Sequence, residues 1–299
     1  MARRKPPQID GFLSVDKPAG ITSHDAVAIA RRSLGEKRIG HSGTLDPDAT
    51  GLLLMGVGRA TKLLPFLTDL RKTYVGQIVL GTTTNTLDSQ GDITGVFDMS
   101  GVKLSDVIAQ TAALTGDILQ IPPMVSALKV DGKRLHELAR QGIEVERKPR
   151  PVTVYRFDVF GTDESHVFRC EVECSSGTYI RSLAADVGTA LGGGAHLRGL
   201  RRTVIGSFDV EDASPIDKII LRPMTDALVD YQTVVVPTEL VIKVSRGSVL
   251  ERAACAFVGC GPWPMLTEAG ELLGVYHAHT GTTVKPAVIL PPAFQTVGQ

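Results

Sequence analysis

The sequence predicts an α+β protein with a central, mainly antiparallel sheet flanked by helices and loops, followed by a small β-rich unit. Three observations lead to this fold class. Several segments alternate apolar and polar residues as half-buried strands do, the strands and helices lack the regular spacing of βαβ units, and strand-and-turn patterns dominate after about residue 235. The 299 residues suit about two domains, here of unequal size.

The expected domain boundaries follow from these patterns. We expect a disordered tail over 1–10, a main domain over 11–235 with a long insertion at 120–150, and the small unit over 236–299. An insertion of this length inside a compact domain is typically functional or mobile.

The first fifty residues predict a strand, a helix and a loop. Segment 11–20 reads as a short strand that ends in a Lys-Pro-Ala-Gly turn. A helix follows, with Ser23 as the expected N-cap and Gly35 as the residue that ends it. Segment 39–51 has no periodicity and many turn-forming residues, so it is expected to be a loop.

The next hundred residues contain the long insertion. Before it, 52–57 reads as a buried strand or helix segment, 73–81 as a strand and 82–92 as a polar loop, and a helix is expected from a Ser105 cap to about residue 115. Within the insertion, Asp131-Gly132 predicts a hairpin-like turn, and a short helix is expected over 134–141.

Two alternating segments, 150–161 and 165–177, predict adjacent strands. The second places five residues on one face: His166, Phe168, Cys170, Val172 and Cys174. Segment 178–192 predicts an amphipathic helix, and 197–210 returns as a strand.

The formal net charge is zero, which at first argues against a nucleic-acid partner. The charge is unevenly spread, because 203–299 carries six basic and ten acidic residues and the remainder therefore carries a net charge of +4. Segment 129–150 alone has seven basic and four acidic residues, and a second basic run lies at 196–202. Such runs contact phosphates in nucleic-acid-binding proteins, although a solvated surface explains them equally well.

Other function classes lack their sequence patterns. No apolar run approaches the ~20 residues of a membrane helix, and no apolar stretch follows the charged N-terminus, so neither a span nor a signal peptide is expected. The four cysteines form no disulfide framework, which favours a reducing cytoplasm. Cysteine and histidine spacings do not suit zinc, and glycines 192–194 lack a nucleotide-binding pattern. We therefore expect no metal and no cofactor.

The segment GHSGTLDPDATG (40–51) remains as a candidate for chemistry. Asp46 precedes a proline, which disfavours the helical conformation and keeps the residue extended. A carboxylate in a rigid loop is suited to act as a nucleophile or base. An Asx turn or a helix cap is the alternative explanation.

Six ordered segments resemble one family. GHSGTLDPDATGLLLMGVGRATK (40–62) carries the pattern G-x-L-D-P-x-A-x-G of the TruB family of bacterial tRNA pseudouridine-55 synthases. The further matches are DKPAGITSHDAV (16–27), KTYVGQIVLGTTTNTLDSQGD (72–92), PPMVSALKVDGKRLHELAR (122–140), SSGTYIRSLAADVG (175–188) and GGGAHLRGLRR (192–202). The last 60 residues resemble the family's small PUA-like RNA-binding domain.

The resemblance implies a pseudouridine synthase fold and the isomerisation of uridine 55 in the T-loop of tRNA, by base flipping and without a cofactor. It makes Asp46 the nucleophile that attacks either the sugar C1′ or the base C6, and Arg181 its partner. It also implies that Tyr74 packs on the target base and takes part in proton transfer.

The remaining expected substrate contacts come from the same resemblance. Tyr179 and Leu200 match pocket residues, although both also suit a core, and His41 matches a histidine that stacks in the T-loop. Lys17, with Pro18, matches a motif that supports the catalytic loop, and we include it among the substrate-binding residues. The insertion matches a mobile, tRNA-closing segment called the thumb, whose candidate phosphate contacts are Lys129, Lys133, Arg134 and Arg140, with Arg198, Arg201 and Arg202 as weaker ones.

The expected partner is therefore the T-arm and T-loop of tRNA, bound by a cytoplasmic protein that is monomeric and has no obligate protein partner. Three alternatives stay open: a guide-RNA-dependent synthase of the archaeal and eukaryotic kind, a tRNA-folding chaperone without essential catalysis, and a small-molecule enzyme with one acidic loop.

Overall fold

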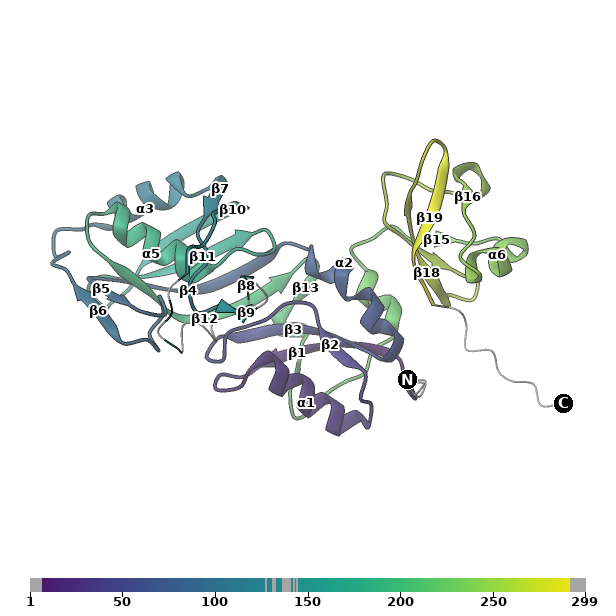
Figure 1. Ribbon diagram of the computed structural model, residues 1–299, viewed down its shortest axis with the longest axis horizontal. Coiled ribbons are helices and arrows are strands. Elements are labelled where there is room, and N and C mark those ends of the chain that lie inside the picture. Colours follow the sequence, from purple (N-terminus) through teal and green to yellow (C-terminus); the bar gives the residue numbers. More distant parts are fainter. Residues whose placement is uncertain are drawn as a thin grey trace.

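A computed structural model describes residues 7–126, 128–130, 133–135, 141, 143 and 145–290. Within this part of the chain, ten strands form one sheet in the order β14-β1-β3-β12-β4-β11-β10-β7, with β13 beside β12 and β2 beside β3. A second sheet has the order β15-β17-β18-β19-β16 (Figure 1).

The strands of the large sheet are β1 (Gly11–Lys17), β2 (Ile39–His41), β3 (Thr50–Val57), β4 (Lys72–Leu80), β7 (Gly116–Gln120), β10 (Arg150–Gly161), β11 (Val167–Cys174), β12 (Ala195–Ile205), β13 (Phe208–Asp209) and β14 (Ser214–Pro215). The small sheet contains β15 (Val234–Val235), β16 (Leu250–Glu251), β17 (Trp263–Leu266), β18 (Leu272–Ala278) and β19 (Thr283–Ile289).

Two short hairpins pair β5 (Thr82–Thr84) with β6 (Ile93–Val96) and β8 (Lys129–Val130) with β9 (Lys133–Arg134). The α-helices are α1 (Ser23–Leu34), α2 (Leu64–Thr68), α3 (Leu104–Ala113), α5 (Ile180–Ala190) and α6 (Val241–Ser245). Five 3₁₀ turns complete the described elements: η1 (Gly58–Leu63), η2 (Val210–Asp212), η3 (Met224–Leu228), η4 (Thr238–Leu240) and η5 (Arg252–Ala254).

The prediction of an α+β protein with a mainly antiparallel sheet is confirmed. In the large sheet only β1 with β14 and β12 with β3 run parallel, and the other paired strands run antiparallel. Strand β12 joins the two halves of the sheet, because it pairs with β4 along most of its length and with β3 at Arg201 and Arg202.

Strand β3 is buried on both faces, which explains the continuous apolar run at 52–57 and resolves it as a strand. On one face, Leu53 and Met55 pack with Ala26 and Ala30 of α1. On the other face, Leu52 and its neighbour Leu54 belong to a cluster with residues of η1, α2 and η3.

Helices α3 and α5 cover one face of the other half of the sheet (Figure 1). Leu183 and Val187 of α5, and Val107 of α3, pack with the apolar face of β11. This face carries the predicted residues of 168–174, which are buried, whereas His166 lies before the strand with a positive φ of 61°. The predicted helix over 178–192 and the predicted strand after it are confirmed by α5 and β12.

Two predicted helix caps are wrong, because a neighbouring residue has the extended backbone that a cap needs. Thr22 caps α1: it accepts from Asp25 N at 3.0 Å, and the Asp25 carboxylate accepts from Thr22 N at 2.9 Å. Ser23 is therefore the first helical residue. Helix α3 starts at Leu104, one residue before the predicted Ser105 cap. Gly35 ends α1 in the left-handed conformation, as predicted.

Two further expectations need correction. The segment predicted as a polar loop, 82–92, contains strand β5, which pairs with β6. The predicted tail does not extend to residues 7–10: Gln8 N donates to Glu36 at 2.8 Å, and Asp10 pairs with Arg59 at 2.6 Å. Residues 1–6 lie outside the described part.

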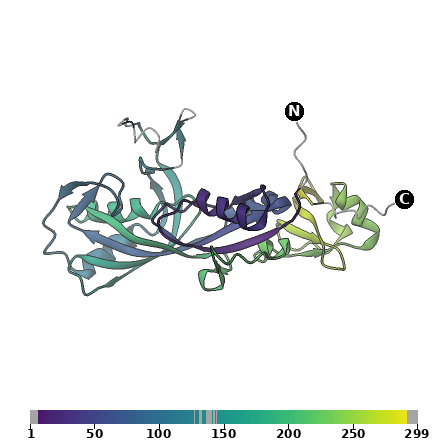
Figure 2. The ribbon, with the colours of Figure 1, turned by 90° about the horizontal axis from the view of Figure 1, so that it is seen from below.

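The insertion contains the expected hairpin, because β8 and β9 pair antiparallel on either side of 131–132. Residues 131 and 132, and most of the helix predicted over 134–141, lie outside the described residues. Figure 2 shows the β8–β9 hairpin standing out from the body of the sheet.

The C-terminal sheet has its own core and also packs against the main domain. Leu273 and Tyr276 of β18 face a cluster that contains Trp263, whereas Leu272 and Val275 face the cluster of β3 and η1. Lys62 of η1 adds a hydrogen bond of 3.0 Å to the carbonyl of Ile289. The strand-rich end of the chain is thus observed, and the domain boundary near 235 stays a prediction.

We predict that Gly51→Ala destabilises the fold by about 2 kcal/mol or more. Gly51 has a φ of 105°, and a Cβ there would overlap the backbone of Arg202 on β12. Strain at a positive φ and overpacking each cost about 1–3 kcal/mol. Denaturant unfolding measures the loss. Gly101→Ala is the control, because a Cβ added at Gly101 would meet open space. An equal effect of both substitutions would contradict the prediction.

Candidate active site

The loop between β2 and β3 carries Asp46, and hydrogen bonds from several elements hold its first half. The Ser23 hydroxyl accepts from Leu45 N at 2.8 Å and donates to Leu45 O at 3.2 Å. Thr68 of α2 donates to the carbonyl of Ser42 at 2.9 Å. Ser23 is buried, so its hydroxyl satisfies main-chain groups of Leu45 that water cannot reach.

The second half of the loop is held by Lys17. Its ammonium is fully buried and donates to the carbonyls of Pro18, Ile21 and Pro47 at 2.8–2.9 Å. Burial lowers the pKa of Lys17 to about 8. All three donors are used on main-chain carbonyls, so the structure favours loop support over substrate contact for this residue.

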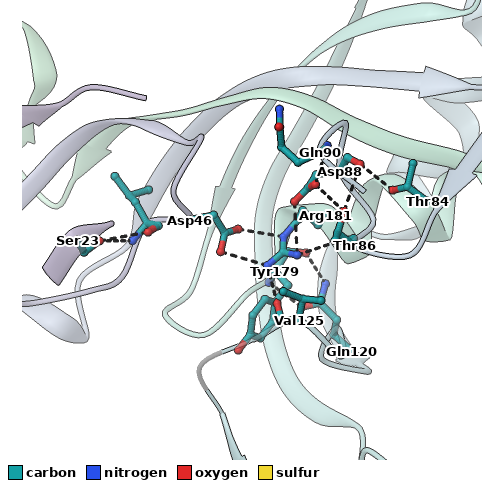
Figure 3. A network of polar contacts seen from close by, with 11 residues as sticks. Ser23, Asp46, Thr84, Thr86, Asp88, Gln90, Gln120, Val125, Tyr179 and Arg181 are labelled. Carbon is teal, nitrogen blue, oxygen red and sulfur yellow. Dashed lines mark hydrogen bonds and ion pairs between the residues drawn. The ribbon is translucent and has the colours of Figure 1, made fainter. Parts of the chain in front are cut away.

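Arg181, in the first turn of α5, forms the centre of the site (Figure 3). Its Nε lies 3.0 Å from Asp46 Oδ2 and its Nη2 lies 3.2 Å from Asp46 Oδ1, so the pair is bidentate. The guanidinium also donates to the carbonyls of Thr86 at 2.7 Å and Val125 at 2.9 Å. The arginine side chain is 5% exposed and that of Asp46 is 40% exposed, so the carboxylate is the accessible member of the pair.

Asp88 is a second acidic neighbour that the sequence analysis did not single out. Its Oδ2 lies 3.5 Å from Arg181 Nη1, and its Oδ1 accepts from Thr86 Oγ1 at 2.6 Å and from Gln90 N at 3.1 Å (Figure 3). Asp88 lies in the matching segment 72–92. The sequence pattern could not predict that Asp88 lies close to Arg181, because the two residues meet only in the folded chain.

The electrostatics of Asp46 reflect two opposed effects. Desolvation raises the pKa of Asp46, and Asp88 adds to the increase, whereas Arg181 acts in the opposite direction and favours the charged form. The carboxylate is partly desolvated and is oriented by a fixed cation. It is therefore suited to attack an electrophilic carbon.

Two cavities meet at the Asp46–Arg181 pair. The first, of about 330 Å³, is lined by Asp46, Arg181 and three residues predicted as substrate contacts: Tyr74, Tyr179 and Leu200. The second, of about 380 Å³, lies on the side of Asp88 and shares Leu200 with the first. A larger cavity of about 990 Å³ lies between α1, β2 and η1, and none of the predicted site residues lines it.

The two tyrosines lie on different elements. Tyr74 is on β4, opposite Val172 of β11 and Arg202 of β12. Burial raises its pKa, and the positive charge of Arg202 opposes this increase. Tyr179 precedes α5, where the Gln120 amide bonds both its N–H at 2.8 Å and its carbonyl at 3.0 Å. Burial raises the pKa of Tyr179 as well.

His41 ends β2 and does not line the cavity of Asp46. Its ring lies 5.4 Å from the ring of His24 in an edge-to-face arrangement. Its Nδ1 is buried and has no hydrogen-bond partner among the described residues. Burial lowers the pKa of His41 to about 4, with His24 and Arg202 adding to the decrease, so the ring is neutral near pH 7.

The candidate phosphate contacts divide into two groups. The backbones of Lys129, Lys133 and Arg134 form the β8–β9 hairpin, but their side chains, and all of Arg140, lie outside the described residues. The three arginines of β12 have partners within the protein. Arg198 binds Glu164 at 2.8 Å, and Arg201 binds Asp16 at 2.8 Å. Arg202 is 1% exposed, so the expected phosphate contact does not hold for this residue.

Two other kinds of site are absent from the described ranges. No helix there is long and apolar enough to cross a membrane. No group of three or more histidine, cysteine or acidic side chains there is arranged to hold a metal ion.

The chain is similar to proteins of known class. The family model described as TruB family pseudouridylate synthase (N terminal domain) matches residues 31–180. The tRNA pseudouridine synthase B of Rhodococcus jostii is 52% identical over 217 residues, which are 71% of each chain. That of Geobacillus thermodenitrificans is 39% identical over 300 residues, or 95% of this chain and 98% of the relative. The crystal structure of a Cbf5-Nop10-Gar1 complex matches with a TM-score of 0.73 at 27% identity, over 94% of this chain and 85% of that chain.

We predict that His41 makes the fold less stable in acid. Its folded pKa of about 4 lies below the unfolded value of about 6.5, so the unfolded chain binds more protons between these pH values. The free energy of unfolding therefore falls as the pH decreases from about 6.5 to about 4. Denaturant unfolding at several pH values should show a smaller fall for His41→Gln. His279→Gln, at an exposed histidine, should leave the wild-type slope intact. A His41→Gln slope equal to that of the wild type would contradict the assignment.

Proposed function

Because the chain belongs to the TruB family of pseudouridylate synthases, we propose that it converts uridine 55 in the T-loop of tRNA to pseudouridine. One observation carries the proposal: the accessible Asp46 carboxylate is held bidentate by the buried Arg181 at a cavity lined by Tyr74 and Leu200. The curated relatives named above are tRNA pseudouridine synthases.

In the proposed reaction, the bond between the ribose C1′ and the uracil N1 breaks, the base turns, and a bond forms between C1′ and C5. The C5 proton leaves and N1 gains a proton, so the conversion is an isomerisation without oxidation or reduction. Asp46 is the proposed nucleophile, which forms a covalent bond to the target nucleotide and later leaves. One difficult step is thereby divided into two easier ones.

The proposed role of Arg181 is to keep the nucleophile ionised and aimed. An opposite charge favours the carboxylate form, and the bidentate geometry restricts its rotation. Because the same guanidinium binds the carbonyls of Thr86 and Val125, its own orientation is also fixed. Correct placement of a reacting group before the reaction contributes strongly to catalysis.

The cavity suits a single base that has left its stack. Its volume of about 330 Å³ lies at the lower end of the range of about 300–1,000 Å³ for small-molecule pockets. Removing a base from a folded loop costs a few kcal/mol, which pockets recover by stacking and by hydrogen bonds to the base edge. Tyr74 and Leu200 offer surfaces for stacking, and Tyr179 offers a polar group.

The insertion supports tRNA as the substrate. Its hairpin carries basic residues and stands out from the sheet. Val125, near the start of the insertion, bonds directly to Arg181. Closure of the insertion on the T-arm would therefore act on a segment that contacts the catalytic pair. We further propose that residues 236–299 form a PUA-like domain, and that the protein acts as a monomer in the cytoplasm.

We predict that Asp46→Asn abolishes pseudouridine formation in an unmodified tRNA transcript while tRNA binding persists. Loss of a covalent nucleophile lowers catalytic rates by ~10³-fold or more. Chemical mapping of pseudouridine and a filter-binding assay measure the two effects. Asp158→Asn is the control, because Asp158 forms an exposed ion pair on β10. Product formed by Asp46→Asn would rule out the nucleophile, and binding by the wild type without product would favour the chaperone alternative.

We predict that Arg181→Lys lowers the single-turnover rate by about a hundredfold with little change in tRNA affinity. Lysine keeps the charge but loses the fork that binds Asp46 and two carbonyls, and small misplacements of reacting groups have effects of ~10²-fold. A loss of affinity that accounts for the whole effect would instead make Arg181 a substrate contact.

We predict that the double variant Lys133→Ala and Arg134→Ala weakens tRNA binding and reduces its salt dependence. Each lost phosphate contact lowers the slope of log K against log salt by roughly one unit or less. Affinities measured at several salt concentrations test the prediction. An unchanged slope would remove both residues from the interface.

A further inference from the structure

Arg202 is a buried cation that contacts the backbone on both sides of the nucleophile. It lies on β12 and is 1% exposed. Its Nη2 donates to the carbonyl of Gly43 at 3.2 Å and its Nε donates to that of Leu52 at 2.7 Å. Gly43 lies three residues before Asp46 and Leu52 lies six residues after it. One guanidinium thus spans the loop that presents the carboxylate.

The same side chain lies beside Tyr74 on the neighbouring strand. Arg202 is opposite Tyr74 in the β12–β4 register and opposite Gly51 in the β12–β3 register. Residues directly opposite each other on paired strands share a face of the sheet, and Tyr74 and Arg202 both line the cavity of Asp46. The guanidinium is therefore a cation next to the phenol as well as next to the Asp46 loop.

Packing alone does not account for a cation at this place. None of the ion pairs between described residues includes Arg202, whose described hydrogen-bond partners are the carbonyls of Gly43 and Leu52. Burying a cation without a carboxylate has a large desolvation cost, and an apolar side chain of similar size is often at least as stable in such a position. The charge and the fork geometry are thus the properties that need an explanation.

We propose that Arg202 is a positioning residue, which fixes the Tyr74 phenol and the Asp46 loop relative to each other. The proposal deepens the proposed function. It rests on that function for one point, which is that Tyr74 acts at the target base. It assigns no contact between Arg202 and RNA, since the side chain acts through Tyr74 and Gly43.

The charges around Tyr74 agree with this assignment. Burial raises the pKa of Tyr74, and Arg202 on β12 is the neighbour that lowers it. Cys174 on β11 and Asp46 in the loop act in the raising direction. Removal of the arginine should therefore raise the pKa of Tyr74 further.

The test measures Tyr74 directly, in the full-length protein without RNA. With ¹³Cζ-labelled tyrosine, the five tyrosine signals are recorded by NMR from neutral to alkaline pH, and Tyr74→Phe assigns the signal of Tyr74. In Arg202→Gln this signal should move at neutral pH, and its titration midpoint should rise, because the positive charge that favours the phenolate is lost. Arg169→Gln, at an exposed arginine of β11, is the control and should change neither quantity.

Single-turnover kinetics with a tRNA transcript give the second readout. The rate should fall by about tenfold or more in Arg202→Gln, with the tRNA dissociation constant unchanged. In Arg202→Lys the tyrosine midpoint should stay near that of the wild type, because the charge is retained. The rate should remain low there, because lysine cannot span Gly43 and Leu52 together.

Two results would overturn the proposal. The first is a Tyr74 signal and midpoint that are unchanged in Arg202→Gln, whatever happens to the rate. The second is full activity in Arg202→Lys, which would show that the fork is not needed. If Arg202→Gln does not fold, Arg202→Lys decides by its midpoint and rate together. A wild type that forms no pseudouridine would refute the proposed function, and the NMR experiment would still report whether Arg202 orients Tyr74.

Discussion

The ion pair between Asp46 and Arg181 is the interaction on which the rest of the site depends. One guanidinium binds the carboxylate, the carbonyls of Thr86 and Val125, and the second acid Asp88. These partners come from the loop that carries Asp46, the turn after β5 and the start of the insertion. The pair therefore joins segments far apart in sequence, and a change in any of them alters the orientation of the Asp46 carboxylate.

Buried cations capped by main-chain carbonyls recur around the pair. Lys17 supports the loop after Asp46, and Lys72 donates to the carbonyls of Thr68 and Leu70 at the end of α2. Burial lowers the pKa of both lysines to about 8. Because each cation uses its donors on fixed carbonyls, the loops keep one conformation. These hydrogen bonds within the protein orient the accessible Asp46 carboxylate without help from bound water.

Local patterns predicted most of the fold because they depend on near neighbours in the chain. Alternation identified β10 and β11, helical spacing identified α5, and turn-forming residues located the loop around Asp46. Some errors lie where a local rule allowed two solutions. Thr22 and Ser23 are both good caps; in the structure Thr22 caps the helix, and the Ser23 hydroxyl bonds the backbone of Leu45 instead.

The sequence by itself determined the family, the α+β class and the candidate reactive residues, since these depend on residue types and their order. Only the tertiary structure decided which residues meet. The bidentate contact of Asp46 with Arg181, the approach of Asp88 and the burial of Arg202 all depend on strand register and helix packing across more than a hundred residues or between separate elements. Contacts of this kind have no local signature, because their energy depends on the desolvation and geometry that the completed fold creates.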